Sequence, residues 1–368
     1  MTNSQSVPLG YLCEFRYGKS LPASSRNPGP YPVFGSNGEV GTHDKSITNG
    51  PAIIVGRKGS VGALHFSLGP CWPIDTTYYV ESSKGTDLRW LFRALSTLGL
   101  DGLNRAAAIP GLNRDDAYRK RLLLPPIEEQ RRIAAILDQA DALRAKRRET
   151  LTTLESLIGS AFTASFGDPR RWAQRWEIGR IADTVQTVNY GTSQKAGSDG
   201  TWPVLRMGNL TTTGRITLDD LKYLDLSDPD IARYTVRRGD ILFNRTNSPE
   251  LVGKTAVVRT DLPLAFAGYL IRVRTNARHN PEFVSGYLNS RHGKAVLRGM
   301  NKAIVGQANI NAKELQSIPI ALPPKVLQDE FADRVGAINT QREAAQRSLA
   351  TLDELFASLQ SRAFSGQL

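Results

Sequence analysis

The chain has 368 residues, enough for two domains with substantial cores, and a formal net charge of +12, which favours an anionic partner. Its two cysteines, Cys13 and Cys71, are too few for a disulfide framework or a zinc site. Because no apolar run approaches the roughly 20 residues of a membrane span and the N-terminus lacks the charged and apolar regions of a signal peptide, we expect the protein in the reducing cytoplasm.

The segment 1–121 predicts a mixed α/β unit. Short apolar runs at 52–56, 76–80 and 122–124 read as strands, and 7–12 reads as a strand or a turn. Apolar residues at helical spacing predict a helix over 87–98. A further helix begins near residue 113, with Asn113 or Asp115 as its N-cap.

The segment 122–168 predicts one long helix. It opens on Leu-Pro-Pro-Ile-Glu-Glu-Gln at 124–130, where the prolines end the preceding strand and lie just ahead of the first helical turn. Apolar residues then recur at steps of three and four and form one seam, which Arg144 interrupts. The seam residues include Ile133, Leu137, Leu151, Leu154 and Ile158.

The segment 169–319 loosely repeats the order of residues 1–121. Tyr190 begins the sequence Tyr-Gly-Thr-Ser, which is similar to the Tyr-Gly-Lys-Ser that begins at Tyr17. Arg245 comes directly after a predicted buried strand, as Arg57 does. We therefore interpret 169–319 as a second globular domain of the same design.

The segment 320–368 repeats the first helix without a gap. Pro323, Gln328 and Phe364 stand 198 positions after Pro125, Gln130 and Phe166. Its seam includes Phe331, Val335, Leu349, Leu352 and Phe356, with Arg342 at the position that matches Arg144. Since each helix has one apolar seam, we expect an antiparallel coiled-coil pair within an α+β fold, with a polar seam position that sets the register.

The positive charge lies outside the predicted helices. Residues 1–121 hold 14 basic and 9 acidic residues, and residues 169–319 hold 22 and 13, whereas each helical segment has one more acidic than basic residue. A long polyanion contacted by two basic domains explains this distribution, although a generally basic surface is the simpler alternative.

Loops after the predicted strands carry side chains suited to nucleic acid. Arginine can grip guanine, and asparagine or glutamine adenine, through two hydrogen bonds, but most such side chains in DNA-binding proteins contact phosphates or only water. The candidates are Tyr17, Lys19, Arg57, Lys58, Tyr190, Arg206, Asn209, Arg245, Asn247, Lys254, Lys302, Gln307 and Asn309.

Catalytic and metal-binding motifs are missing from the sequence. Gly18-Lys-Ser and Gly253-Lys-Thr resemble the end of a P-loop, but Cys13 and Ser248 stand where that loop needs its first glycine. The four histidines are scattered without metal-ligand spacing, and no nuclease-like acidic cluster is evident. We expect no catalytic residue and no metal site.

Together and in this order, the motifs resemble the specificity (S) subunit of type I restriction-modification enzymes. The resemblance rests on the motif at 124–130, on Phe-Gly-Asp-Pro at 166–169, on Gly-Asp-Ile-Leu-Phe-Asn-Arg at 239–245 and on Phe-Ser-Gly-Gln-Leu at 364–368. It implies target recognition domains at 1–121 and 169–319, with helical spacers at 122–168 and 320–368.

The resemblance also implies partners. Each recognition domain would read one half of an interrupted site in double-stranded DNA. The helices would bind two modification (methyltransferase) subunits, and the restriction (motor-nuclease) subunits would join that complex. The chain itself would need no cofactor, because S-adenosylmethionine, ATP and Mg²⁺ would belong to the partners.

Other function classes remain open at this point. A nuclease or ATPase with dispersed residues would show turnover by the chain alone. A scaffold whose basic domains contact RNA or a membrane would not distinguish a specific from a random duplex. A component of another phage-defence system with the same design is a third alternative.

Overall fold

The computed structural model describes residues 5–81, 85–103, 111–248, 251–300 and 308–368. The chain forms two compact units. Unit 1 comprises Met1–Arg148 and Arg347–Leu368, and unit 2 comprises Glu149–Gln346. Within the described ranges, none of the helices combines the length and the apolar character that crossing a membrane requires.

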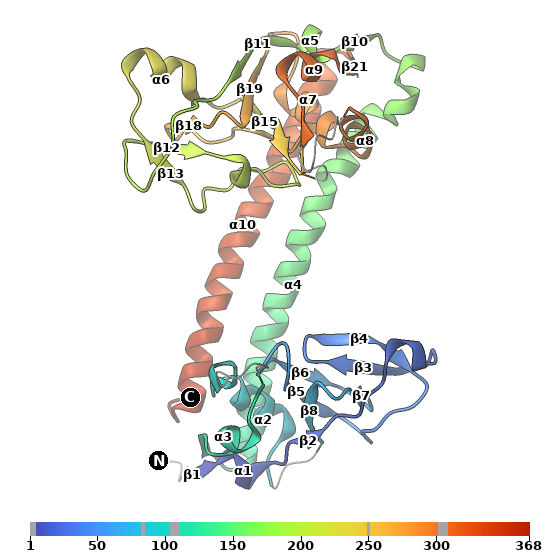
Figure 1. Ribbon diagram of the computed structural model, residues 1–368, viewed down its shortest axis with the longest axis vertical. Helices are drawn as coiled ribbons and strands as arrows, with labels where there is room; N and C mark the ends of the chain where they lie inside the picture. The colour runs from blue at the N-terminus through green and yellow to red at the C-terminus, as the bar shows by residue number, and fades with distance from the viewer. Residues whose placement is uncertain (1–4, 82–84, 104–110, 249–250, 301–307) are drawn as a thin grey trace. The chain divides into compact units, whose positions relative to one another are not determined.

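The elements of unit 1 outside the long helices are β1 (Gln5–Pro8), α1 (Leu9–Leu12), β2 (Arg16–Tyr17), β3 (Tyr31–Gly35), β4 (Gly38–His43), β5 (Ala52–Gly56), β6 (Leu64–Ser67), β7 (Trp72–Pro73), β8 (Thr77–Val80), α2 (Leu88–Leu95), α3 (Arg114–Tyr118) and β9 (Arg121–Leu124). One antiparallel sheet has the order β2-β8-β5-β6. A second, β4-β3-β7, contains the parallel pair β3/β7, and β1 pairs with β9. Apolar β5 is buried at the centre, and α2 contacts β5 and β6 (Figure 1).

Most predicted elements of unit 1 are confirmed, and the structure resolves two open choices. Asp87 caps α2 by accepting a hydrogen bond from the Trp90 N–H. Asn113, rather than Asp115, caps α3. The run at 7–12, predicted as a strand or a turn, divides at Pro8 into strand β1 and the helical turn α1.

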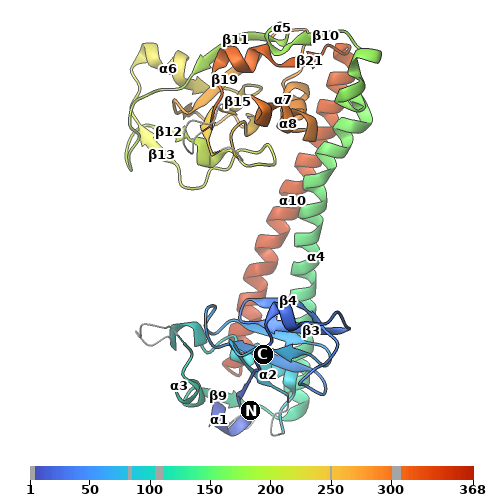
Figure 2. The ribbon, with the colours of Figure 1, turned by 45° about the vertical axis from the view of Figure 1, so that its right-hand side comes forward.

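Unit 2 contains β10 (Ile178–Arg180), α5 (Ile181–Thr184), β11 (Val185–Tyr190), β12 (Trp202–Leu205), β13 (Lys222–Leu224), α6 (Asp228–Tyr234), β14 (Thr235–Val236), β15 (Ile241–Asn244), β16 (Thr246–Asn247), β17 (Thr255–Val257), β18 (Leu264–Phe266), β19 (Leu270–Thr275), α7 (Pro281–Asn289), α8 (Arg291–Gly299), β20 (Ala308–Asn309), α9 (Ala312–Ser317) and β21 (Pro319–Ala321). The antiparallel sheet β11-β19-β15-β17 has the topology of β2-β8-β5-β6. The second sheet, β13-β12-β18-β14, contains the parallel pair β12/β18 as its counterpart of β3/β7. β10 pairs with β21, as β1 pairs with β9, and α7 packs beside α8 (Figure 2).

Two helices of 40 residues, α4 (Ile127–Phe166) and α10 (Lys325–Phe364), are each divided between the two units. Each unit therefore contains one half of α4 and one half of α10. In unit 1, Arg132 contacts the carbonyl of Leu368 and Arg144 contacts Asp353, so the two halves run antiparallel. Unit 2 has the same arrangement: the Phe166 ring packs on the Phe331 ring near one end of the paired halves, and Arg334 donates to Ser165. The expected fold class, an α+β protein with an antiparallel helix pair, is confirmed.

The helix ends pack into the globular cores as well as against each other. Ile133 and Leu137 are buried in the core of unit 1, and Phe331 and Val335 are buried in that of unit 2. The remaining apolar seam residues, Leu151, Leu154, Ile158, Leu349, Leu352 and Phe356, are half-buried. The sequence predicted the seam but did not show that its outer thirds belong to the domain cores.

A buried glutamine joins each long helix to its globular domain. The Gln130 amide donates to the Pro125 carbonyl over 2.8 Å and accepts from the Asp87 N–H over 2.8 Å. Gln328 makes the same two bonds, donating to Pro323 over 2.8 Å and accepting from the N–H of Asn280, the N-cap of α7, over 2.9 Å. Because both side chains are buried, these backbone groups have no water to replace the glutamine.

We expect Gln328→Ala to lower the free energy of unfolding by about 2–4 kcal/mol, because it leaves a buried N–H and a buried C=O unpaired. Urea unfolding followed by circular dichroism measures the change. The matched control is Gln341→Ala, at an exposed glutamine of the same helix, with an expected loss below about 0.5 kcal/mol. Equal losses in the two variants would contradict the role of Gln328.

A half-buried polar contact holds α8 in unit 2. The Lys294 ammonium donates to the Gly253 carbonyl over 2.8 Å, and no ion pair joins it to a carboxylate among the described residues. Burial, and then the nearby charges of Lys254 and Arg298, lower the pKa of Lys294 from 10.5 to about 8. The folded state therefore holds this proton less firmly than the unfolded chain does.

The sign of the resulting pH dependence follows from this depressed pKa. Below pH 8 the lysine is charged in both states and its burial penalty is fully present. Above that pH the unfolded chain binds more protons, so stability should rise. We expect the unfolding free energy of wild type, relative to Lys294→Met, to increase between about pH 7.5 and 9.5 in urea titrations. Lys313→Met, at an exposed lysine of unit 2, is the control, and a difference independent of pH would refute the expectation.

Candidate nucleic-acid interface

In unit 1, an arginine lies against a tyrosine ring at one end of the sheet β2-β8-β5-β6. Tyr17 ends the edge strand β2, and Arg57 follows the central strand β5. The Arg57 guanidinium lies 5.2 Å from the Tyr17 ring centroid, and Nη2 donates to the Asp75 carbonyl over 2.8 Å. Tyr17 is exposed, so the pair lies at the protein surface.

Unit 2 repeats this pair with different neighbours. The Arg245 guanidinium lies 4.7 Å from the ring of Tyr190, which ends β11. Its Nε donates to the Asn309 side-chain oxygen over 3.3 Å. The backbone crossing also repeats: Leu112 N–H donates to the Arg57 carbonyl and Ile310 N–H to the Arg245 carbonyl, each over 2.9 Å. The sequence correspondence of the two tyrosines and the two arginines is therefore confirmed in space.

Neither arginine is neutralised by a carboxylate. No ion pair of Arg57 or Arg245 occurs within the described ranges, so each guanidinium keeps its charge and free donors beside an aromatic ring. Such a pair can hold a phosphate or a base edge while the ring orients the cation. Arg114 adds a second cation 5.5 Å from the Tyr17 ring, which the sequence analysis missed; its place directly after the Asn113 cap is the signal that could have identified it.

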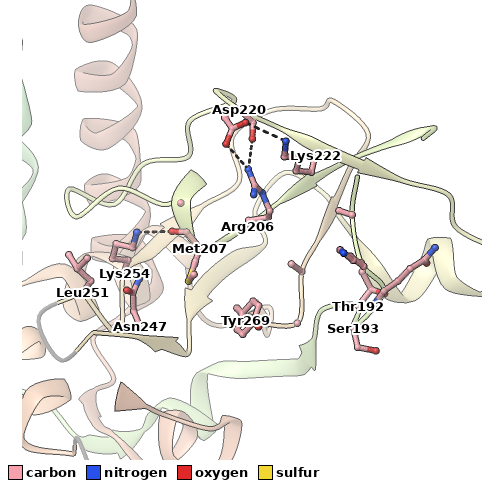
Figure 3. Close-up of a pocket in the computed structure, with 16 residues that line it drawn as sticks. Thr192, Ser193, Arg206, Met207, Asp220, Lys222, Asn247, Leu251, Lys254 and Tyr269 are labelled. Atoms are coloured by element: carbon pink, nitrogen blue, oxygen red, sulfur yellow. Dashed lines mark hydrogen bonds and ion pairs between the residues drawn. The ribbon is translucent and has the colours of Figure 1, made fainter. Parts of the chain in front are cut away.

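A cavity of about 910 Å³ in unit 2 gathers three further candidates. Arg206, Asn247 and Lys254 line it, together with the exposed Tyr269. Figure 3 shows Asn247 and Lys254 on the opposite side of Tyr269 from Thr192 and Ser193. The cavity thus combines cations, an amide and an exposed ring, a combination suited to a nucleotide.

The two cations of this cavity are held differently. Arg206 pairs with Asp220 over 2.9 Å and also donates to the carbonyl of that residue. Lys254 is only 8% exposed, and its ammonium donates to the Met207 carbonyl over 2.7 Å. Burial lowers the pKa of Lys254. Among the described residues no carboxylate pairs with Lys254, so its ammonium is open to an anion in the cavity.

The remaining DNA-binding candidates lie in different surroundings. Asn209 is buried; its oxygen accepts from the Arg206 N–H, and its amide donates to the Thr217 and Asp219 carbonyls, so it stabilises a turn and cannot reach a base. Lys19 and Lys58 are exposed in unit 1. The candidates Lys302 and Gln307 lie outside the described residues.

Across the described ranges, no group of three or more histidine, cysteine or acidic residues could hold a metal ion. Both cysteines are buried, and burial raises the pKa of the Cys13 thiol to about 12, which keeps it protonated.

Comparisons with known proteins identify similar DNA specificity proteins. The sequence profile described as "Type I restriction modification DNA specificity domain" matches residues 1–155. The specificity subunit of the type I restriction enzyme EcoKI from Escherichia coli K12 is 25% identical over 265 residues, which are 67% of this chain and 57% of that protein. The chain thus spans just over half the length of this relative.

Two solved structures share the fold over nearly the whole chain. The S subunit of a type I restriction-modification system from M. genitalium has a TM-score of 0.65 at 15% identity, covering 99% of this chain and 96% of that one. A chain solved in work on complex assembly and conformational transition of the type I R-M system has a TM-score of 0.57 at 16% identity, covering 99% and 98%. Residues 1–155 thus match the profile of the type I restriction modification DNA specificity domain, and over a larger share of the chain the sequence and the fold are similar to type I specificity subunits.

Proposed function

We propose that this chain is the non-catalytic subunit that reads DNA for a type I restriction-modification complex. The observation that carries the proposal is the repeated surface: each unit presents an unneutralised arginine on a tyrosine at the end of the same antiparallel sheet. Two equivalent surfaces on one chain suit a duplex site with two halves. In this proposal residues 1–121 and 169–319 are the target recognition domains, and the chain works in the cytoplasm.

The neighbours of the two arginines suggest that the half-sites differ in sequence. Arg57 stands beside a second cation, Arg114, whereas Arg245 is joined to the amide of Asn309. A pair of arginines favours guanine or phosphate, and an arginine with an asparagine favours a mixed sequence that contains adenine. The site read by the two units would then be asymmetric.

The basic charge of the two globular domains supports a duplex as the ligand. The excess of basic over acidic residues in 1–121 and in 169–319 would attract the phosphate backbone whatever the sequence. The cavity with Arg206, Asn247 and Lys254 would add contacts in unit 2.

The segments 122–168 and 320–368 would separate the readers and bind the partners. A helix of 40 residues is about 60 Å long, which leaves room for two readers one DNA turn apart. Leu157 and Leu355, 198 positions apart in the repeat, are 39% and 48% exposed. Matched exposed leucines would suit equivalent contacts with two modification (methyltransferase) subunits.

The remaining components of the reaction would come from the partners. In this proposal S-adenosylmethionine is bound by the modification subunits, and ATP and Mg²⁺ serve the restriction (motor-nuclease) subunits. The chain itself would need no cofactor. Co-expression with the methyltransferase encoded beside it, followed by mapping of methylated bases, tests the function directly. Turnover of DNA or ATP by the purified chain alone would refute the proposal.

We expect Arg57→Ala and Arg245→Ala each to weaken binding of the complex to its mapped site by roughly 10- to 100-fold, because each removes a charged, base-reaching group. Fluorescence anisotropy at one stated salt concentration measures the affinity. Duplexes with one altered half-site should show that each variant has lost discrimination at a different half. The control is Arg238→Ala, an exposed arginine already paired with Asp261 over 2.7 Å. A loss as large in this control would contradict the assignment.

We expect removal of one heptad from both helices, residues 147–153 and 345–351, to shorten the gap between the half-sites by about three base pairs. The half-sites themselves should stay the same, because no residue of the two readers changes. Methylome sequencing of cells with the variant complex measures both properties. Altered half-site bases with an unchanged gap would show that the helices do not set the spacing.

A further inference from the structure

The middle of α10 in unit 2 contains a buried asparagine and a half-buried arginine, and both carry buried polar atoms without partners. Asn339 is 5% exposed, and neither its amide nitrogen nor its oxygen has a hydrogen-bond partner. Arg342, one turn further along, has a buried Nε without a partner, and no ion pair joins it to a described residue. Both side chains line a pocket of about 160 Å³, together with Arg215, Arg259 and Glu343.

Unit 1 shows what the matching arginine has and Arg342 lacks. Arg144 donates to Asp141 over 2.8 Å and to Asp353 over 2.6 Å, and it packs on the Phe356 ring at 4.3 Å. Asp141 stands 198 positions before Asn339, so the repeat replaces a carboxylate by an amide of nearly the same shape. The second arginine therefore loses one of its two anionic partners.

The other anionic partner is already engaged in unit 2. Glu155 stands 198 positions before Asp353, but it pairs with Arg215 over 2.8 Å. Arg259 is held by Glu282 through two bonds of 2.6 and 2.7 Å. These two ion pairs leave the Arg342 guanidinium as the unmatched charge of the pocket.

The carboxylate of Glu343 does not compensate the charge of Arg342. Glu343, the next residue along α10, also lines the pocket but is exposed on the helix surface, where water screens its charge. Burial, followed by the charges of Arg215 and Arg259, lowers the pKa of Arg342, while Glu343 and Glu155 act in the opposite direction. A desolvated arginine of this kind gains most from an anion that it can contact directly.

We propose that this pocket binds a small free oxyanion, a carboxylate or a phosphate, between Arg342 and Asn339. The Nε of the arginine and the amide nitrogen of the asparagine are two buried, unused donors on residues that line the same pocket. The bound oxygens lie where the Asp353 carboxylate accepts from the Arg144 Nε in unit 1, because its counterpart Glu155 is paired with Arg215 in unit 2. The volume of about 160 Å³ exceeds the roughly 30 Å³ of one water several-fold, so such an ion fits. The site is independent of DNA reading, since none of its residues belongs to the proposed interface.

The test is thermal unfolding of the full chain in sodium acetate or sodium phosphate, with sodium chloride added to keep the ionic strength constant. We expect a saturable rise in Tm of roughly 2–5 °C for wild type with at least one of the two anions. Acetate alone would identify a carboxylate site, and phosphate alone a phosphate site. Hydrogen exchange should slow at residues 336–346 as the anion saturates.

The chain offers a matched control in Asn339→Asp. This variant supplies the carboxylate of unit 1 from within the protein, so its Tm should exceed that of wild type without added anion and should lose the saturable response. Arg342→Met should also lose the response, because the cation is gone. General salt effects on stability would raise all three proteins alike.

Two results would overturn the proposal. One is a wild-type Tm that shows no saturable dependence on either anion. The other is an equal dependence in wild type and Asn339→Asp, which would show that the anions act elsewhere or only as general stabilisers.

Discussion

The buried glutamine at the start of each long helix fixes how that helix meets its globular domain. Gln130 joins the carbonyl of Pro125 to the N-cap of α2, and Gln328 joins the carbonyl of Pro323 to the N-cap of α7. A side-chain amide can serve both groups because it carries a donor and an acceptor at once. The proline turn, the long helix and a helix of the globular domain therefore keep one geometry in both units.

This constraint lets the globular surfaces vary while their positions on the helices stay alike. The sheets β2-β8-β5-β6 and β11-β19-β15-β17 have equivalent strand orders, and each has a tyrosine beside an arginine at its end. The neighbouring residues differ, with Arg114 in one unit and Asn309 in the other. A duplicated scaffold with unlike contacts is what the reading of an asymmetric DNA site requires.

The helix pair shows the same principle in its charges. Both helices carry an arginine in the seam, but Arg144 forms ion pairs with two carboxylates, whereas Arg342 forms none with the residues that the structure describes. Since a buried charge is stabilised only by close partners, the exchange of Asp141 for Asn339 changes the polar centre without changing the backbone. Arg144 and Arg342 thus occupy equivalent positions in the repeat but have different electrostatic surroundings.

The sequence alone determined the repeat, the long helices, their apolar seam and the correspondence of Arg57 with Arg245, because each of these follows from local spacing, from the constant offset of 198 or from the order of the motifs. The tertiary structure decided which side chains meet. Asn209 was a base-reading candidate by type, yet carbonyls eight and ten residues away occupy its amide. The gathering of Arg206, Asn247 and Lys254 around one cavity, and the pairing of Glu155 with Arg215 rather than Arg342, likewise depend on segments far apart in the chain. Hydrogen bonds and ion pairs act over a few ångströms, so only the folded chain settles which groups come within that range.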